Sequence, residues 1–337
     1  MNQTQALHLH QKHPVVLIHD HEPLTDDMEK MKAARISGKV MLATLDMVMG
    51  KPLRGEIVPD GGWAAYAEGY FRQALDDIAT HPDRLMLART ADDLIRAHAE
   101  DKIGIVLGSE GGKLLEASIE KLHHFYQMGM RWLQLNWAFE NELCGAQSRP
   151  PGIGLKPFGR DVIREMNRLG MIIDLEHSSQ RGFYDVLELS KHPVVFSHCG
   201  CRAIEPTGAT FWGCILEDND LRAIAKNGGL VGINFYPYVF RKPPDGVTLG
   251  TVLDHFDHFV NLIGADHLAL GCDYFPDYGD WAEMQAAQNQ YPVKFVIEKK
   301  DLALVTTKLL ERGYAEPDIA KILGGNFLRV CRNVFGR

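Results

Sequence analysis

Residues 172–198, IIDLEHSSQRGFYDVLELSKHPVVFSH, contain the pattern that decides the fold of this chain. A helical pattern separates two apolar runs, at 172–175 and at 194–197. The first run leads into His177 and the second into His198. Short apolar runs joined by a helix predict two parallel strands in a βαβ unit. We therefore expect both histidines at the same edge of a parallel sheet, where its strands end.

The same alternation extends along the chain. The predicted strands cover residues 15–18, 39–45, 103–107, 132–136, 172–175, 194–197, 230–235 and 268–271. The predicted helices cover residues 64–78, 91–99, 117–128, 160–169, 179–189, 218–227, 252–263, 302–312 and 317–323. Runs that are apolar throughout suit strands buried on both faces. Eight such repeats without a linker predict one α/β domain over residues 1–337, a single (β/α)8 TIM-type barrel.

The composition argues against several classes of protein. The chain has 36 basic and 44 acidic residues, a formal charge of −8, so nothing favours nucleic acid or an anionic membrane as partner. No apolar run approaches the roughly 18 residues of a membrane span, and the N-terminus is polar and histidine-rich. We expect a cytoplasmic protein that acts on a small molecule.

The cysteines lack the spacing of a disulfide framework. They are Cys144, Cys199, Cys201, Cys214, Cys272 and Cys331. Two of them form a C-x-C pair directly after His198, and such a pair could bind zinc. The chain has no second pair to complete a site with four thiolates. We therefore expect reduced, partly buried thiols.

The carboxyl ends of the predicted strands carry metal-binding side chains. In a β/α barrel these ends form the face that holds the active site. Five of the eight strands lead into such residues: His19, His21, Glu110, His177, His198 and Asp273. Residues i and i+2 of a strand point to the same side, so His19 and His21 both face inward. A single histidine is more often a surface or core residue than a metal ligand. Here four histidines follow apolar strands, and a position unrelated to metal binding would require several independent coincidences.

This arrangement predicts a site for two divalent ions. His19 and His21 can bind one ion, His177 and His198 can bind the other, and a carboxylate can bridge them. Imidazole and carboxylate ligands suit zinc, although nickel, iron, cobalt and manganese stay open. A hydroxide shared by two metals roughly 3.5–4 Å apart is a strong nucleophile near neutral pH. Asp273 can then shuttle its proton.

Longer motifs surround these residues: GSEGG (108–112), PFGR (157–160), DLEH (174–177), SH (197–198), INFY (233–236), LGCD (270–273) and ILGGNF (322–327). Together they resemble the membrane (renal) dipeptidase family of the amidohydrolase superfamily. The resemblance covers nearly the whole chain and is weakest in residues 1–60 and 205–216. It implies an amidohydrolase-like barrel, a homodimer, and hydrolysis of a small amide, most naturally a dipeptide.

The resemblance also implies roles for single residues. The implied metal ligands are His19, His21, Glu110, His177 and His198. Glu110 matches the carboxylate that bridges both metals, and Asp273 matches the aspartate that passes the proton to the leaving amine. Tyr236 matches a tyrosine near the substrate. Family dipeptidases usually have H-x-D on the first strand, so His21 is a departure.

Two further departures concern the substrate. Animal members of the family have a histidine after the fourth strand that contacts the reacting carbonyl, and this chain has Trp137 there, as some bacterial members do. The family also has an arginine after the sixth strand that binds the substrate carboxylate, whereas residues 207–216 contain no arginine. Arg202 is a candidate replacement, although a surface or loop-tethering role fits it equally well.

These departures leave alternatives to a dipeptidase. The same scaffold could hydrolyse a non-dipeptide amide, an N-acyl amino acid or a lactone, because barrel loops support many chemistries. An alternative of a different class is a barrel that only binds or scaffolds. That alternative predicts the loss of a metal ligand or of Asp273, and the sequence retains them all. Metal-dependent amide hydrolysis is therefore the interpretation that we favour.

Overall fold

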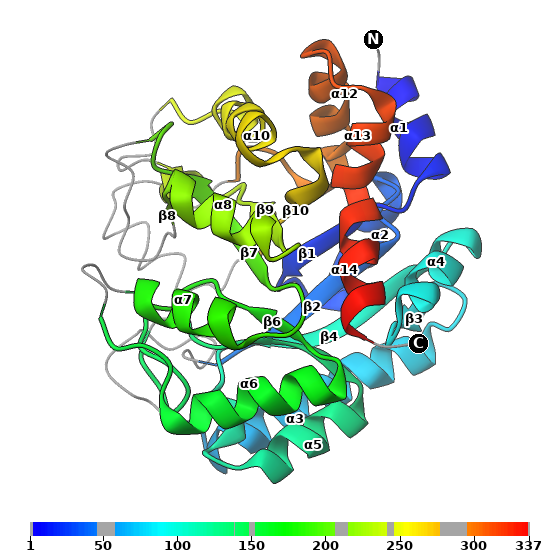
Figure 1. Ribbon diagram of the computed structural model, residues 1–337. Helices are drawn as coiled ribbons and strands as arrows, with labels where there is room; N and C mark the ends of the chain where they lie inside the picture. Colours follow the sequence, from blue (N-terminus) through cyan, green and yellow to red (C-terminus); the bar gives the residue numbers. More distant parts are fainter. Residues whose placement is uncertain are drawn as a thin grey trace.

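Eight parallel strands form a closed barrel with helices around it, as the sequence predicts (Figure 1). The computed structural model describes residues 3–45, 58–137, 139–147, 152–205, 215–240, 246–276 and 295–335. The barrel strands are β1 (Val16–Asp20), β2 (Gly38–Thr44), β4 (Ile103–Glu110), β5 (Met130–Gln134), β6 (Ile172–Asp174), β7 (Val195–Cys201), β9 (Leu230–Ile233) and β10 (Leu268–Leu270). Each lies on or within a few residues of a predicted strand.

The barrel closes because β2 pairs with both β1 and β4. The ring runs β2-β1-β10-β9-β7-β6-β5-β4, and the β2–β4 register continues from Gly38 opposite Gly104 to Thr44 opposite Glu110. Two short strands lie outside the ring. β3 (Leu85–Leu87) pairs with β4, and β8 (Ile215–Leu216) pairs with β7. The sequence analysis missed both, because two or three residues carry no readable periodicity.

The helices pack on the outside of this ring (Figure 1). They are α1 (Gln3–Lys12), α2 (Leu24–Ala33), α3 (Gly62–Thr80), α4 (Ala91–Ala99), α5 (Ile119–Met128), α6 (Pro157–Leu169), α7 (Gln180–Leu189), α8 (Asp218–Lys226), α9 (Pro237–Phe240), α10 (Leu249–Ile263), α12 (Ala303–Glu311), α13 (Glu316–Ala320) and α14 (Asn326–Val334). Short helical turns are η1 (Lys113–Leu115), η2 (Ala265–His267), η3 (Lys299–Asp301) and the π-helical η4 (Lys321–Gly325). None of the helices described here combines the length and apolarity that a membrane crossing requires.

Irregular strand register turns the metal-binding side chains inward. Ile18 belongs to the apolar cluster inside the barrel, so His19 would face outward in a regular strand. The β1–β2 register shifts between Leu17 and Asp20, and such an irregularity re-aims the side chains beyond it. His19 and His21 therefore face the mouth of the barrel, and Asp20 faces α2. A similar shift on β7 lies between Phe196 and Cys199, around His198.

Behind the end of β1, two buried lysines form ion pairs with three carboxylates. Lys39 Nζ lies 2.7 Å from Asp20 Oδ1 and 2.8 Å from Asp27 Oδ2. Lys299 Nζ lies 2.6 Å from both of these carboxylates and equally close to Glu22. Burial alone would raise the pKa of Asp27, but the two ammonium groups hold it below its usual value. This lysine–carboxylate network fixes the strand that carries His19 and His21.

We expect Lys39→Met to lower the free energy of unfolding by about 3–5 kcal/mol, because it removes one partner of a buried ion pair. The matched control is Lys30→Met, which removes an ammonium group that contacts Glu22 at the surface and is 45% exposed. The control should change stability by less than about 1 kcal/mol. Urea denaturation followed by circular dichroism measures both values, and equal losses in the two variants would contradict the network's role.

Candidate metal centre

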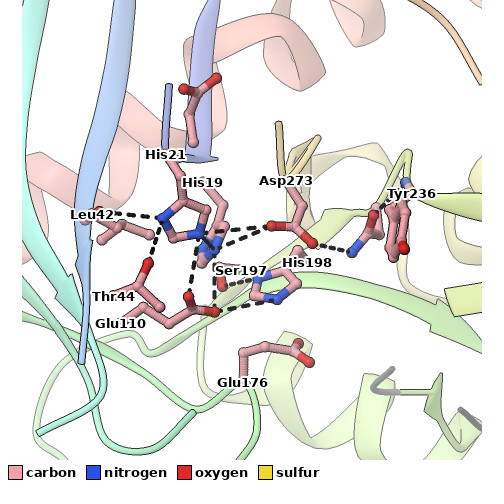
Figure 2. A network of polar contacts seen from close by, with 12 residues as sticks. His19, His21, Leu42, Thr44, Glu110, Glu176, Ser197, His198, Tyr236 and Asp273 are labelled. Carbon is pink, nitrogen blue, oxygen red and sulfur yellow. Dashed lines mark hydrogen bonds and ion pairs between the residues drawn. The ribbon is translucent and has the colours of Figure 1, made fainter. Parts of the chain in front are cut away.

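Four imidazoles and two carboxylates converge at the mouth of the barrel, around the carboxyl ends of β1, β4, β6, β7 and β10. Figure 2 shows His19, His21, His198 and Asp273 directed toward one another beside Glu110. The His19 and His21 Nε2 atoms are 3.0 Å apart, and the His177 and His198 Nε2 atoms are 3.2 Å apart. The structure thus brings together the six residues that the sequence analysis assigned to metal binding and proton transfer.

Glu110 lies between the two pairs of histidines. Its Oε2 atom is 3.2 Å from His21 Nε2. Its Oε1 atom is 3.5 Å from His19 Nε2, 3.4 Å from His177 Nε2 and 3.9 Å from His198 Nε2. One carboxylate therefore faces both pairs, which is the arrangement that a bridging ligand requires.

Two of the imidazoles, those of His21 and His198, are held from their other side. His21 Nδ1 lies 3.2 Å from the Leu42 carbonyl oxygen and 3.1 Å from the Thr44 hydroxyl (Figure 2). His198 Nδ1 lies 2.8 Å from the Ser197 hydroxyl. Such contacts set the orientation of metal-binding histidines and their tautomer. Thr44, the last residue of β2, was not singled out in the sequence, and Ser197 was noted only as part of the SH motif.

The burial of this cluster controls its ionisation. Burial lowers the pKa of His19 to about 4 and that of His198 well below its usual value, so both are neutral ligands near pH 7. Burial also acts to lower the pKa of His21, but the adjacent Glu110 carboxylate outweighs it and raises this pKa to about 8. For Glu110, burial opposes ionisation, yet the surrounding imidazoles hold its pKa well below the usual range. The carboxylate is therefore ionised.

Two residues of the cluster have an unusual backbone conformation. His177 has a φ of 62° and Asp273 has a φ of 58°, both in the left-handed region that non-glycine residues rarely adopt. Strain of this kind persists only where the surrounding structure enforces it, and it concentrates at functional sites. Each residue lies three positions beyond the end of its strand, His177 after β6 and Asp273 after β10. The conformation aims their side chains into the cluster.

Asp273 has the position and the ionisation of a proton shuttle. Its Oδ1 atom is 3.6 Å from His19 Nε2 and 3.8 Å from His21 Nε2. Its Oδ2 atom accepts a hydrogen bond of 3.1 Å from Asn234 Nδ2. Burial raises the pKa of Asp273 to about 7. A carboxyl group with such a pKa gains and loses a proton easily at neutral pH.

The three residues assigned to the substrate differ in their surroundings. Trp137 lies near Gly111, the residue that follows Glu110. A Cβ atom added to Gly111 would lie 3.8 Å from the Trp137 backbone nitrogen. The Tyr236 ring packs against Phe275, with ring centres 5.2 Å apart. Arg202 lies 3.7 Å from Glu217 at the start of α8. The roles of these three residues in substrate binding stay predictions. Most of the segment 207–216, which contains no arginine, lies outside the described residues.

The donor set fits two divalent cations. Within each pair the Nε2 atoms face each other, at 3.0 and 3.2 Å, and at most one of the two can carry a proton, because two N–H donors pointing at each other would repel. Ligand atoms of His19, His21 and Glu110 lie close enough together to bind one ion. Those of Glu110, His177 and His198 form a second such group. Imidazole nitrogen and carboxylate oxygen are ligands of zinc and related metals.

A parallel barrel with this cluster at its strand ends defines the class of amidohydrolase-like, metal-dependent barrels. Residues 71–335 match the membrane dipeptidase family, peptidase family M19, and the chain belongs to this family. The match begins after β1 and β2, so the assignment of His19 and His21 rests on the geometry of the cluster. Family membership agrees with the resemblance that the sequence motifs indicated.

The curated relatives are dipeptidases. Dipeptidase tcpJ of Claviceps purpurea is 34% identical over 258 residues, which cover 75% of this chain and 56% of that protein. Dipeptidase 3 of Rattus norvegicus is 30% identical over 301 residues, which cover 84% of this chain and 57% of that protein. The chain therefore spans little more than half the length of these relatives.

Solved structures share the fold. An amidohydrolase from Pseudomonas aeruginosa has a TM-score of 0.82 at 22% identity, over 98% of this chain and 99% of that one. A metallopeptidase from Rhodobacter sphaeroides, solved with a phosphinate mimic of the dipeptide L-Ala-D-Ala, has a TM-score of 0.76 at 22% identity. It covers 95% of this chain and 99% of that one. At these identities the likeness establishes the fold.

We expect Glu110→Gln to weaken metal binding by at least ~10-fold, because it removes the negative charge that both pairs of histidines share. Elemental analysis after dialysis against a metal buffer would measure the loss against the metal content of the unchanged chain. The matched control is Glu140→Gln, an exposed carboxylate that contacts Lys156. An unchanged metal content in Glu110→Gln would show that this carboxylate is not a ligand.

Proposed function

We propose that this chain is a binuclear-metal hydrolase that cleaves the amide bond of dipeptides. The observation that carries the proposal is the Glu110 carboxylate between two pairs of imidazoles at the barrel mouth. Membership of the membrane dipeptidase family supports the substrate class. The dipeptide mimic bound by the structurally similar metallopeptidase supports it further. Zinc is the proposed metal, because imidazole and carboxylate ligands suit it.

Two zinc ions, when bound, would polarise the scissile carbonyl and lower the pKa of a shared water. The chain's own residues supply the rest of the mechanism. Glu110 keeps the two pairs of imidazoles in a fixed relation and offsets part of the cationic charge. Asp273 accepts a proton at Oδ1, the oxygen that faces His19 and His21. It then returns the proton to the nitrogen of the leaving amine.

Asn234 directs Asp273 in this task. The Asn234 Nδ2 group donates to Asp273 Oδ2, and its Oδ1 atom accepts a hydrogen bond of 2.6 Å from the Tyr236 backbone. The amide is thereby fixed in one orientation, and it leaves Asp273 Oδ1 to carry the proton. The Tyr236 ring packs against Phe275 and Phe295.

We expect Asp273→Asn to lower kcat for a dipeptide by about 10²–10⁴-fold, because the amide cannot accept the proton. Hydrolysis is followed by release of free amino acids, and the metal content of the variant is measured in parallel. The matched control is Asp266→Asn, whose carboxylate is 62% exposed and contacts Lys321. A kcat that is reduced less than ~10-fold in metal-loaded Asp273→Asn would remove Asp273 from the mechanism.

The activity should also depend on pH through Asp273. Burial raises its pKa to about 7 in the absence of cations, and nearby cations lower a carboxyl pKa. Because Asp273 accepts a proton only when ionised, kcat should fall as the pH decreases through this pKa. We expect the acid limb of the kcat profile at or below about pH 7. An acid limb that is retained in Asp273→Asn would assign it to another group.

A substrate panel separates the dipeptidase proposal from its alternatives. We expect the zinc-loaded chain to hydrolyse dipeptides with a higher kcat/KM than N-acyl amino acids or lactones. The test compares a broad dipeptide library with matched N-acyl amino acids at equal concentration. Preferential cleavage of a lactone or an N-acyl amino acid would reject the dipeptidase proposal and retain the metal-dependent hydrolase.

A further inference from the structure

A second group of metal-binding side chains lies outside the barrel mouth, where β7, α8 and α10 meet. Ligand atoms of Cys201, Asp218 and His258 lie within 4.8 Å of one another. Figure 1 shows α8 beside β7 and β8, with α10 next to it. Cys201 is the last residue of β7, Asp218 is the first residue of α8, and His258 lies in the second half of α10. Three elements thus direct a thiol, a carboxylate and an imidazole to one point.

The backbone around Cys201 is fixed. Cys201 pairs with Leu216 of β8, and the chain then turns directly into α8. The Cys201 N–H group donates a hydrogen bond of 3.1 Å to His255 Nδ1. Burial lowers the pKa of His255 to about 3, so this imidazole is uncharged and does not repel a nearby cation. The position of the thiol is therefore set by strand pairing and by a buried neutral histidine.

The sulfur atom has surroundings suited to a thiolate ligand. Burial raises the pKa of the Cys201 thiol, and the N–H groups of Ile204 and Ala203, which point at the sulfur, act in the opposite direction. Amide donors of this kind stabilise a negatively charged sulfur. The remaining opposition comes from the negative charges of Asp218 and Glu217. These negative charges raise the pKa of the Cys201 thiol, whereas a cation bound beside the sulfur would lower it.

The carboxylate and the imidazole already contact each other. His258 Nε2 lies 2.8 Å from Asp218 Oδ1. The other carboxylate oxygen, Oδ2, lies 3.8 Å from Arg222, so the arginine leaves Oδ1 free to face the histidine. The Asp218 and His258 side chains are 34% and 22% exposed. Solvent, and with it a metal ion, therefore reaches the group from this side.

We propose that Cys201, Asp218 and His258 form a separate site for a zinc-type divalent cation, with water as the fourth ligand. Thiolate, imidazole and carboxylate are the protein ligands of zinc, and three of them with one open position make a common coordination set. Binding would release the thiol proton to solvent as the metal–sulfur bond forms. This site gives Cys201 of the C-x-C pair a partner set that does not require a second pair of cysteines.

The lysine–carboxylate network shows how this group differs from a simple acidic cluster. Asp20, Glu22 and Asp27 also lie close enough together to bind a cation, but the ammonium groups of Lys39 and Lys299 already pair with them. The group at Cys201 has a soft sulfur ligand and an imidazole, which suit zinc or cobalt rather than an ammonium group.

Cobalt(II) substitution tests the site, because only cobalt bound by a thiolate gives an intense sulfur-to-metal charge-transfer band in the near ultraviolet. The metal-free chain is titrated with cobalt(II) at neutral pH, and both absorbance and bound metal are measured. We expect the band in the unchanged chain and its loss in Cys201→Ser and in His258→Ala. Each variant should also bind one equivalent of metal fewer.

Two matched controls should keep the band. Cys331→Ser removes another buried free thiol, in α14. His123→Ala removes another helical histidine that contacts a carboxylate, that of Glu165. Circular dichroism checks that each variant is folded, and Asp218→Asn replaces His258→Ala if the latter is not. The readout needs no substrate, so its result is independent of the dipeptidase proposal.

The site is rejected if the unchanged chain shows no thiolate band, or if the band persists in Cys201→Ser. It is also rejected if the band depends on Cys201 but is unchanged in both His258→Ala and Asp218→Asn. In that case the contact between Asp218 and His258 only joins α8 to α10.

Discussion

Glu110 is a carboxylate with almost no exposure to solvent, and a buried charge costs several kcal/mol unless its surroundings compensate it. The compensation comes from imidazoles on both sides, all within 3.9 Å. The same residue ends β4, the strand that closes the barrel with β2, where it stands opposite Thr44. The Thr44 hydroxyl in turn contacts His21. Closure of the barrel and assembly of the metal centre therefore depend on one strand end.

The segment His19-Asp20-His21 separates two electrostatic environments. The imidazoles face the barrel mouth, where cations are expected, and Asp20 faces two ammonium groups on the other side of the strand. A third inward ligand at position 20 would crowd the metal centre and would leave Lys39 with only one of its two carboxylate partners, Asp27. The register shift in β1 makes this division possible, because a regular strand after Ile18 would direct His19 outward. A local irregularity thus decides which side chains meet the metals.

The sequence predicted those strands and site residues that a short, continuous stretch of the chain is enough to identify. Runs such as 172–175 and 194–197 located barrel strands, and His177, His198 and Asp273 were found because they follow such runs. Asn234, which holds Asp273, was missed because its role depends on contact across 39 residues. The network of Lys39 and Lys299 was not predicted, because a charged residue in a strand or loop is usually exposed to solvent. Helices α1 and α2 were also missed, since polar residues obscure their apolar faces.

Lys299 and Asp27 lie 272 positions apart in the chain, yet their charged groups are 2.6 Å apart. During synthesis from the N-terminus, the strand with His19 and His21 leaves the ribosome long before Lys299 does. Without Lys299, the Asp20 and Asp27 carboxylates share the single buried ammonium group of Lys39, and among the described residues the Glu22 carboxylate contacts only the exposed Lys30. The buried network behind the first strand is therefore complete only when the segment that carries Lys299 has been made and has packed against the N-terminal part of the chain.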